Sequence, residues 1–95
     1  MSRAFVDEDA GDAGPRYTLP PRNDPGFPAA AARALLRGAD LGDSLSAEEA
    51  TGYRWGDPRL TMEVERLRAA AVERGDDRLE TLADRFLRVA RESAP

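Results

Sequence analysis

The sequence of 95 residues contains no cysteine, histidine, lysine, glutamine or isoleucine. Without cysteine, the chain can form neither a disulfide bond nor a thiolate zinc site. Without histidine, it lacks the usual general base and every Ser-His or Cys-His catalytic arrangement. Without lysine, it has neither a Schiff-base nucleophile nor the phosphate-binding lysine of a P-loop. These absences exclude the most familiar enzyme chemistries.

An enzyme built from this sequence would depend on the side chains of Asp, Glu, Tyr, Ser, Thr and Arg alone. Pairs of carboxylates can perform acid–base chemistry, but they need a desolvated cleft that shifts their pKa values. A single domain of this length has little room for a substrate pocket of ~300 Å³ or more. We therefore predict that the protein is not an enzyme and that it binds no cofactor and no metal.

Long apolar runs and charge segregation are also missing. No apolar run approaches the roughly 18 residues that a membrane span requires, and the N-terminal MSRAFVDEDA lacks the apolar region of a secretion signal. We expect a cytoplasmic protein without membrane association.

The 14 basic residues, all arginine, and the 18 acidic residues give a net charge of −4. Both signs are mixed along the chain, which predicts a solvated surface rather than a nucleic-acid-binding stripe.

Glycine, proline and aspartate interrupt residues 1–26, where no apolar periodicity is present. This composition predicts an extended N-terminal arm. Its acidic run at residues 7–9, with Asp12, lacks the spacing of an EF-hand loop, so we expect a solvated tail there. Its apolar anchors are Phe5-Val6 and Tyr17-x-Leu19. Such an arm would either fray or use these anchors to dock on its own domain or on a partner.

Residues 27–95 are predicted to form a helical domain, because no stretch alternates with the period of a strand. Apolar residues recur at helical spacing on one face, as do Leu60, Val64, Leu67 and Ala71. We predict four helices. The first spans residues 28–37 and ends at Gly38, and the second is a short helix that begins with the capping box Ser46 to Glu49 and ends at Gly52. The third runs from Asp57-Pro58 to Arg74, and the fourth is capped by Asp76 or Asp77.

Only two or three residues separate the third and fourth predicted helices, so these two should be antiparallel neighbours. The predicted fold class is therefore all-α. We expect a small bundle of three to four helices with a C-terminal antiparallel helical hairpin, preceded by the extended arm. A domain of this size buries only about 60% of its unfolded surface and is marginally stable as a monomer. The sequence is therefore compatible with either a monomer or a homodimer.

The segment Tyr53-Arg54-Trp55 is the most distinctive chemistry in the centre of the chain. Two aromatic rings beside an arginine are typical of a cation–π surface that contacts a peptide or a base. Aromatic residues at a corner between helices also serve to fill the core. The sequence leaves both interpretations open, and we treat these three residues as candidate partner-binding positions.

The first six residues, Met1-Ser2-Arg3-Ala4-Phe5-Val6, precede an acidic patch and a proline-rich stretch. This arrangement resembles the N-terminal extension of some GreA/GreB-like transcription factors, which usually have lysine where this chain has Asp7. The resemblance implies a docking peptide for RNA polymerase, with Arg3, Phe5 and Val6 as the contact residues. No part of the chain resembles the β-rich C-terminal domain of that family, so shared transcript cleavage is not implied.

The predicted hairpin tip is also similar to that family, through the run Glu73-Arg74-Gly75-Asp76-Asp77-Arg78. In GreA/GreB factors an acid follows the glycine and a second acid comes three residues later, whereas here Glu80 comes four residues after Asp76. The resemblance implies that Asp76, Asp77 and Glu80 could hold Mg²⁺ in the active site of a polymerase. Helix capping by aspartate accounts for the same residues without any metal.

The segment Leu45–Ala50, followed by Tyr53, resembles the first helix of excisionase-type helix-turn-helix domains. Residues 46–75 hold five arginines and six acids, so the positive face that binds phosphate is missing and nucleic acid is not the expected partner. As a whole, the chain resembles short bacterial proteins with this arm and a WGDPRL-like centre, and this resemblance says nothing about an activity.

The preferred hypothesis is a non-catalytic protein-interaction module whose arm docks on the transcription machinery. The alternatives are a helix-turn-helix-like DNA-binding protein and an acidic-tipped hairpin that acts with Mg²⁺ on RNA polymerase.

Overall fold

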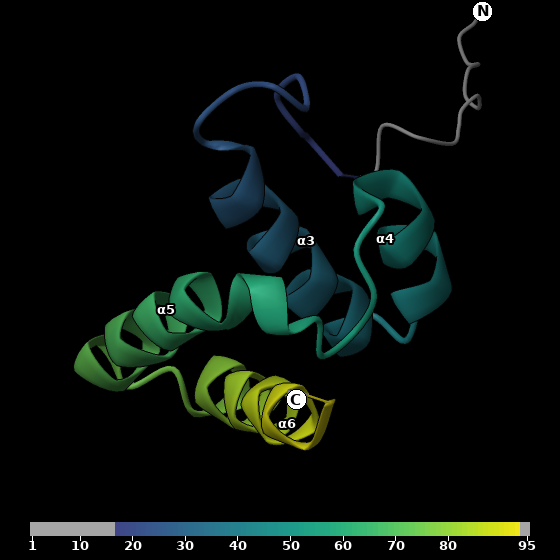
Figure 1. Cartoon of the computed structure of the whole chain (residues 1–95). Helices are drawn as coiled ribbons and strands as arrows, with labels where there is room; N and C mark the ends of the chain where they lie inside the picture. Colours follow the sequence, from purple (N-terminus) through teal and green to yellow (C-terminus); the bar gives the residue numbers. More distant parts are fainter. Residues whose placement is uncertain (1–16, 94–95) are drawn as a thin grey trace, which may run out of the picture.

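A computed structural model describes residues 17–93 of the chain. The predicted contact residues Arg3, Phe5 and Val6 lie outside this range. Within it the structure is helical and contains no strand, which confirms the all-α prediction (Figure 1). None of its helices is long and apolar enough to cross a membrane. The elements are α3 (Phe27–Asp40), α4 (Ser44–Thr51), the 3-10 helix η2 (Pro58–Leu60), α5 (Thr61–Arg74) and α6 (Asp77–Ser93).

The antiparallel hairpin of α5 and α6 forms one layer, and α3 packs across it with α4 on the opposite side of α3 (Figure 1). Asp57 is an N-cap as predicted, because its Oδ1 accepts a hydrogen bond from the backbone N–H of Arg59 at 2.9 Å. The predicted helix does not begin there as an α-helix, since residues 58–60 form the 3-10 helix η2 and α5 begins at Thr61. The helix α5 ends at Arg74, and Gly75 adopts a φ of +73° that favours glycine at the turn. The N-cap of α6 is Asp76, whose Oδ1 accepts from the backbone N–H of Leu79 at 3.1 Å.

The predicted end of the first helix is wrong, because α3 continues through Gly38 to Asp40. Gly38 serves close packing instead of termination. A Cβ atom at this position would lie 2.6 Å from the Cβ of Ala47 in α4 and 3.2 Å from the backbone oxygen of Asp43. The missing side chain therefore lets α4 approach α3.

The predicted capping box of the second helix is also wrong. Helix α4 begins at Ser44, two residues before Ser46, and its N-cap residue is Asp43. The tight connection from α3 sets this start, because the backbone N–H of Asp43 donates to the oxygen of Gly38 at 2.7 Å. The predicted end of the helix at Gly52 is confirmed.

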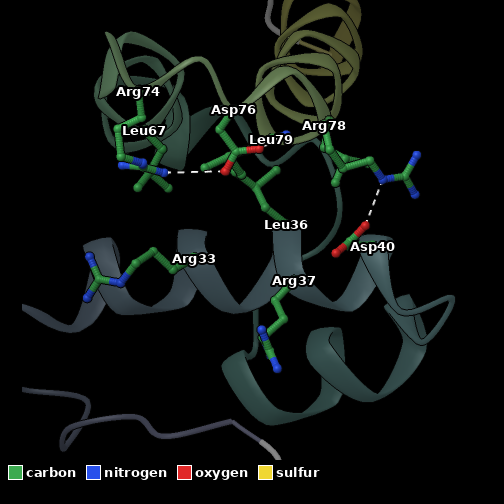
Figure 2. Close-up of a pocket in the computed structure, with 10 residues that line it drawn as sticks. Arg33, Leu36, Arg37, Asp40, Leu67, Arg74, Asp76, Arg78 and Leu79 are labelled. Carbon is green, nitrogen blue, oxygen red and sulfur yellow. Dashed lines mark hydrogen bonds and ion pairs between the residues drawn. The ribbon is translucent and has the colours of Figure 1, made fainter. Parts of the chain in front are cut away.

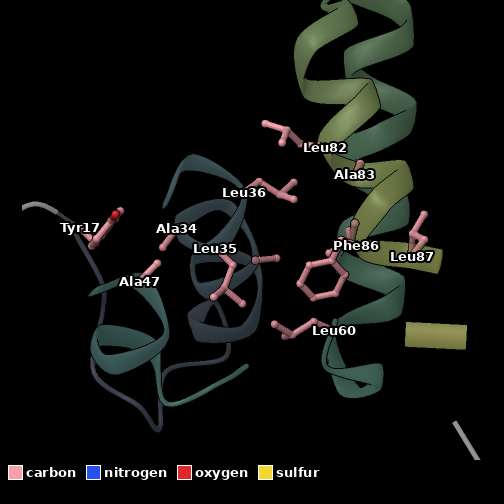
Figure 3. Packing of buried hydrophobic residues seen from close by; sticks show 12 residues of the cluster. Tyr17, Ala34, Leu35, Leu36, Ala47, Leu60, Leu82, Ala83, Phe86 and Leu87 are labelled. Carbon is pink, nitrogen blue, oxygen red and sulfur yellow. The ribbon is translucent and has the colours of Figure 1, made fainter. Parts of the chain in front are cut away.

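The core lies where α3 meets the hairpin (Figure 3). Leu35 of α3, Leu60 at the end of η2 and Phe86 of α6 are fully buried there. Tyr17 is 8% exposed and Leu19 packs against the same cluster. The last part of the predicted arm therefore packs on its own domain, which was one of the two docking sites expected for it.

Candidate functional site

The two aromatic side chains of the central segment are half-buried and contact the core. The ring of Trp55 meets Phe86 edge-on, with centroids 5.0 Å apart and planes at 71°. The backbone N–H of Trp55 donates to Glu48 Oε2 at 2.8 Å, and Tyr53 lies 6.3 Å from Phe27 between ring centroids. These contacts give both rings a structural role at the corner between α4 and η2.

Among residues 17–93, Arg54 forms no cation–π contact with either of the rings that flank it in sequence. The cation over Tyr53 is Arg59, whose Cζ lies 4.9 Å from the ring centroid. Arg59 also forms an ion pair with Asp57 at 2.7 Å. The side-chain hydrogen bonds from Arg59 lower the pKa of Asp57, and partial desolvation opposes them. The Arg59 ion pair thus belongs to the start of the hairpin, and Arg54 is left exposed to solvent.

The three acids of the predicted hairpin tip have separate contacts. Asp76 caps α6 and lies 3.5 Å from Arg74, whereas Glu80 lies 3.5 Å from Arg68 on the other helix of the hairpin. Asp77 is exposed at the first position of α6. Across residues 17–93, no three acidic, histidine or cysteine side chains are grouped closely enough to hold a metal ion.

A groove of about 340 Å³ lies between α3 and the end of the hairpin near Gly75 (Figure 2). We call it the α3–hairpin groove. Leucine side chains from three helices form its apolar part, and arginines and aspartates surround them. The lining residues are Arg33, Leu36, Arg37 and Asp40 of α3, Leu67 and Arg74 of α5, Asp76 of the turn, and Arg78, Leu79 and Leu82 of α6.

Two of the four arginines in this groove are paired with its two aspartates. Arg74 Nη2 lies 3.5 Å from Asp76 Oδ2 within the turn. Arg78 Nε lies 2.7 Å from Asp40 Oδ1 and so connects α6 with the end of α3 (Figure 2). The side chains of both pairs are about half exposed, so the pairs contribute little to stability.

The other two arginines, Arg33 and Arg37, lie one helical turn apart on α3 and are exposed. No carboxylate among residues 17–93 lies within ion-pairing distance of either guanidinium. Four arginines and two aspartates line the groove, a net charge of +2 for its lining residues on a protein whose net charge is −4. This reversal of sign distinguishes the groove from the mixed charge of the chain as a whole. The side chain of Arg37 extends toward the α4 side of α3, at the outer edge of this lining (Figure 2).

The chemistry of the groove is suited to binding. Leucine, arginine and aspartate are its only lining residue types, so it offers no hydroxyl, thiol or imidazole as a nucleophile or general base. Guanidinium groups bind carboxylates through two parallel hydrogen bonds and lose hydration more readily than an ammonium group. A ligand that carries both carboxylates and apolar side chains would complement this surface.

Sequence reasoning missed the groove because its residues come from three separate helices and a turn. A signal was present in the first helix, where Arg33 and Arg37 stand four residues apart with no acid between Asp24 and Asp40 to pair with them. Charges of both signs balance over longer segments, so this pair does not stand out in the overall charge of the chain. Leu36, which lies between the two arginines in sequence, marks the apolar part of the same site.

The chain matches no protein-family model, no curated protein and no solved structure. The resemblance of its first six residues to GreA/GreB-like factors therefore remains a prediction.

Proposed function

We propose that the protein is a non-catalytic interaction module that binds an acidic, leucine-rich segment of a partner protein in the α3–hairpin groove. The observation that carries this proposal is the pair of exposed arginines, Arg33 and Arg37, beside the leucines of the groove. The two guanidinium groups are available for carboxylates of a partner, since residues 17–93 provide none.

The apolar and charged parts of the groove would contribute differently. Burial of apolar side chains on the leucines would stabilise the complex by roughly 25 cal/mol per Å² of surface removed from water. The arginines would mainly speed association and orient the partner, and this contribution weakens as salt rises. Binding should consequently fall with salt without being abolished.

RNA polymerase is the first partner to test, since the resemblance of residues 1–6 implies a docking peptide for it. In this form of the proposal the protein is bacterial, cytoplasmic and associated with transcription, with Arg3, Phe5 and Val6 as additional contacts. Phe5→Ser in the full chain should weaken binding to purified RNA polymerase in a surface-plasmon-resonance measurement. If RNA polymerase did not bind, it would be refuted as the partner, whereas the groove would still be the proposed docking site for another protein.

The two alternatives have less support. A recognition helix needs a positive exposed face, whereas Arg66 on α5 is paired with Glu63 at 3.3 Å and Glu65 is exposed beside them. Of the tip acids, Asp76 and Glu80 contact arginines of this chain, and a metal would have to displace those contacts.

The experiment that tests the groove uses a synthetic amphipathic peptide with leucines at helical spacing and glutamate elsewhere. Titration calorimetry with the full chain should give saturable binding that Arg33→Glu with Arg37→Glu weakens by about tenfold or more. The matched control is Arg85→Glu with Arg88→Glu, which changes the net charge equally at exposed positions of α6 outside the groove. Equal loss in both variants, or tighter binding of a DNA duplex of similar charge, would refute the proposal.

A further inference from the structure

We infer that the partner segment in the α3–hairpin groove is an amphipathic α-helix that lies antiparallel to α3, with its leucines first and its acids in its last turn beside Arg33. The inference rests on the proposed function, because it takes the groove to be the docking site. It adds the secondary structure, the direction and the order of charges that the groove selects in a partner.

The walls of the groove favour a helical occupant. The described part of the chain contains no strand, so it offers no strand edge to which a partner strand could add. The described lining also contains no aromatic side chain of the kind that binds proline-rich segments. The lining residues of α3 lie between positions 33 and 40 and extend over about 10.5 Å along the helix. Roughly two turns of a partner helix can therefore lie along α3.

The two ends of the groove differ in charge. Because α3 crosses the hairpin, Arg33 lies on the α5 side of the groove with Arg74 (Figure 2). Asp40 lies on the α6 side, where its Oδ1 pairs with Arg78 Nε at 2.7 Å and leaves no net charge. Arg74 has only a 3.5 Å contact with Asp76, and Arg33 has no carboxylate of residues 17–93 within ion-pairing distance. The α5 side is therefore the positive end.

The helix dipoles act in the same direction as the side-chain charges. Helix α3 ends at Asp40, so the negative end of its dipole lies on the α6 side of the groove. Helix α5 ends at Arg74 and α6 begins at Asp77, so their opposite dipole ends lie close together at the turn and largely cancel. A partner helix antiparallel to α3 would place its positive N-terminus near the end of α3 and its negative C-terminus beside Arg33.

This arrangement also determines where the acids of the partner lie. A carboxylate in the last turn of the partner helix would meet Arg33, whose guanidinium can donate two parallel hydrogen bonds to it. In a free helix the same placement is unfavourable, because acids repel the negative end of the dipole. The groove therefore stabilises an order of residues that an isolated helix disfavours, which gives it a basis for specificity.

The test uses two forms of the glutamate–leucine peptide that have the same composition and opposite sequence order. The leucine-first peptide carries its glutamates in the last turn, and the glutamate-first peptide carries them in the first turn. A covalent staple on the solvent face holds both peptides as helices, so that the difference in affinity reports the groove. Titration calorimetry with the full chain should give about threefold to tenfold tighter binding of the leucine-first peptide.

Three variants of the full chain test the origin of this preference. Arg33→Gln removes the cation of the α5 side and should abolish most of the preference, while the leucines still bind both peptides. Asp40→Asn leaves Arg78 as a cation on the α6 side and should also reduce the preference. The matched control Arg85→Gln removes the same charge as Arg33→Gln from an exposed position of α6 outside the groove. It should leave the ratio of the two affinities unchanged.

A nitroxide label measures the direction of the bound helix. Placed at the glutamate end of the leucine-first peptide, the label should broaden the methyl resonances of Leu67, on the α5 side of the groove, more than those of Leu41, which follows Asp40. The reverse pattern of broadening would overturn the inferred direction.

Equal affinity of the two peptides, or a preference that Arg33→Gln leaves intact, would overturn the inference while the proposed function stands. Tighter binding of the glutamate-first peptide would overturn it as well, since the groove would then select the opposite order. If neither peptide bound to the wild type, the inference and the proposed function would both be refuted.

Discussion

Arg78 near the start of α6 donates through Nε to Oδ1 of Asp40, the last residue of α3, at 2.7 Å. The two side chains are about half exposed, so the pair stabilises the fold by about 0–1 kcal/mol. Its larger consequence concerns the groove, because Asp40 neutralises one of the four arginines that line it.

Asp40→Asn should therefore increase the affinity of the groove for the glutamate–leucine peptide by about threefold, since a groove charge of +3 replaces +2. The free energy of unfolding should change by less than about 1 kcal/mol, because removing a negative charge at a helix C-terminus offsets the lost ion pair. Calorimetry and chemical denaturation measure the two quantities. Glu92→Gln, at the far end of α6, is the control and should leave the affinity unchanged.

Gly38→Ala should destabilise the protein by about 1–3 kcal/mol. In an ordinary helix this change stabilises by roughly 1 kcal/mol, but here the added Cβ would lie 2.6 Å from Ala47 Cβ and close to backbone. Chemical denaturation of the wild type and the variant measures whether the free energy of unfolding falls or rises.

The double variant Gly38→Ala with Ala47→Gly moves the methyl group from one helix to the other and should recover part of the loss. Stabilisation by Gly38→Ala alone would show that α3 and α4 do not approach as closely as described.

Trp55→Ala should lower the free energy of unfolding by about 2–3 kcal/mol, less than for a fully buried tryptophan. The ring is half-buried and packs edge-on against Phe86. Arg54→Ala should change stability by no more than about 0.5 kcal/mol because its side chain is exposed. If Trp55→Ala left stability intact but weakened partner binding, the ring would belong to a recognition surface instead of the core.

Asp57 should make stability depend on pH in the acid range. Its pKa is lowered in the folded protein, first by the side-chain hydrogen bonds from Arg59. This contribution is present above the ordinary value of 3.8 and is lost as pH falls through the lower, folded-state pKa. Asp57→Asn keeps an oxygen for the backbone N–H of Arg59 but removes the charge.

Denaturation curves of the wild type and of Asp57→Asn at several pH values test this sign. The variant should be less stable at neutral pH, and the difference in unfolding free energy should shrink as the pH approaches 2. A constant difference across this range would show that the charge of Asp57 contributes nothing.

The hairpin was predictable because its signals are local. Asp57-Pro58 starts it, Gly75 supplies the positive φ of its turn, and Asp76 caps the second helix with its own side chain. Each of these roles depends on backbone geometry within a few residues, which sequence patterns report well.

The first two helices were less predictable because tertiary packing determined their ends. Gly38 and Ser46 carry the usual signals of a helix end and a helix start, yet the close contact of Gly38 with Ala47 keeps the glycine inside α3. The groove was missed for the same reason. Arg33 and Leu79 are 46 positions apart in the sequence, and only the packing of α3 on the hairpin places them at one site.

The most direct test of the account is leucine-methyl NMR of the full chain during titration with the glutamate–leucine peptide. We predict saturable shifts for Leu36, Leu67 and Leu79, which line the groove, and none for Leu45, which is 68% exposed on α4. Shifts at Leu45 without shifts at the groove leucines would contradict the claim that the α3–hairpin groove is the docking site.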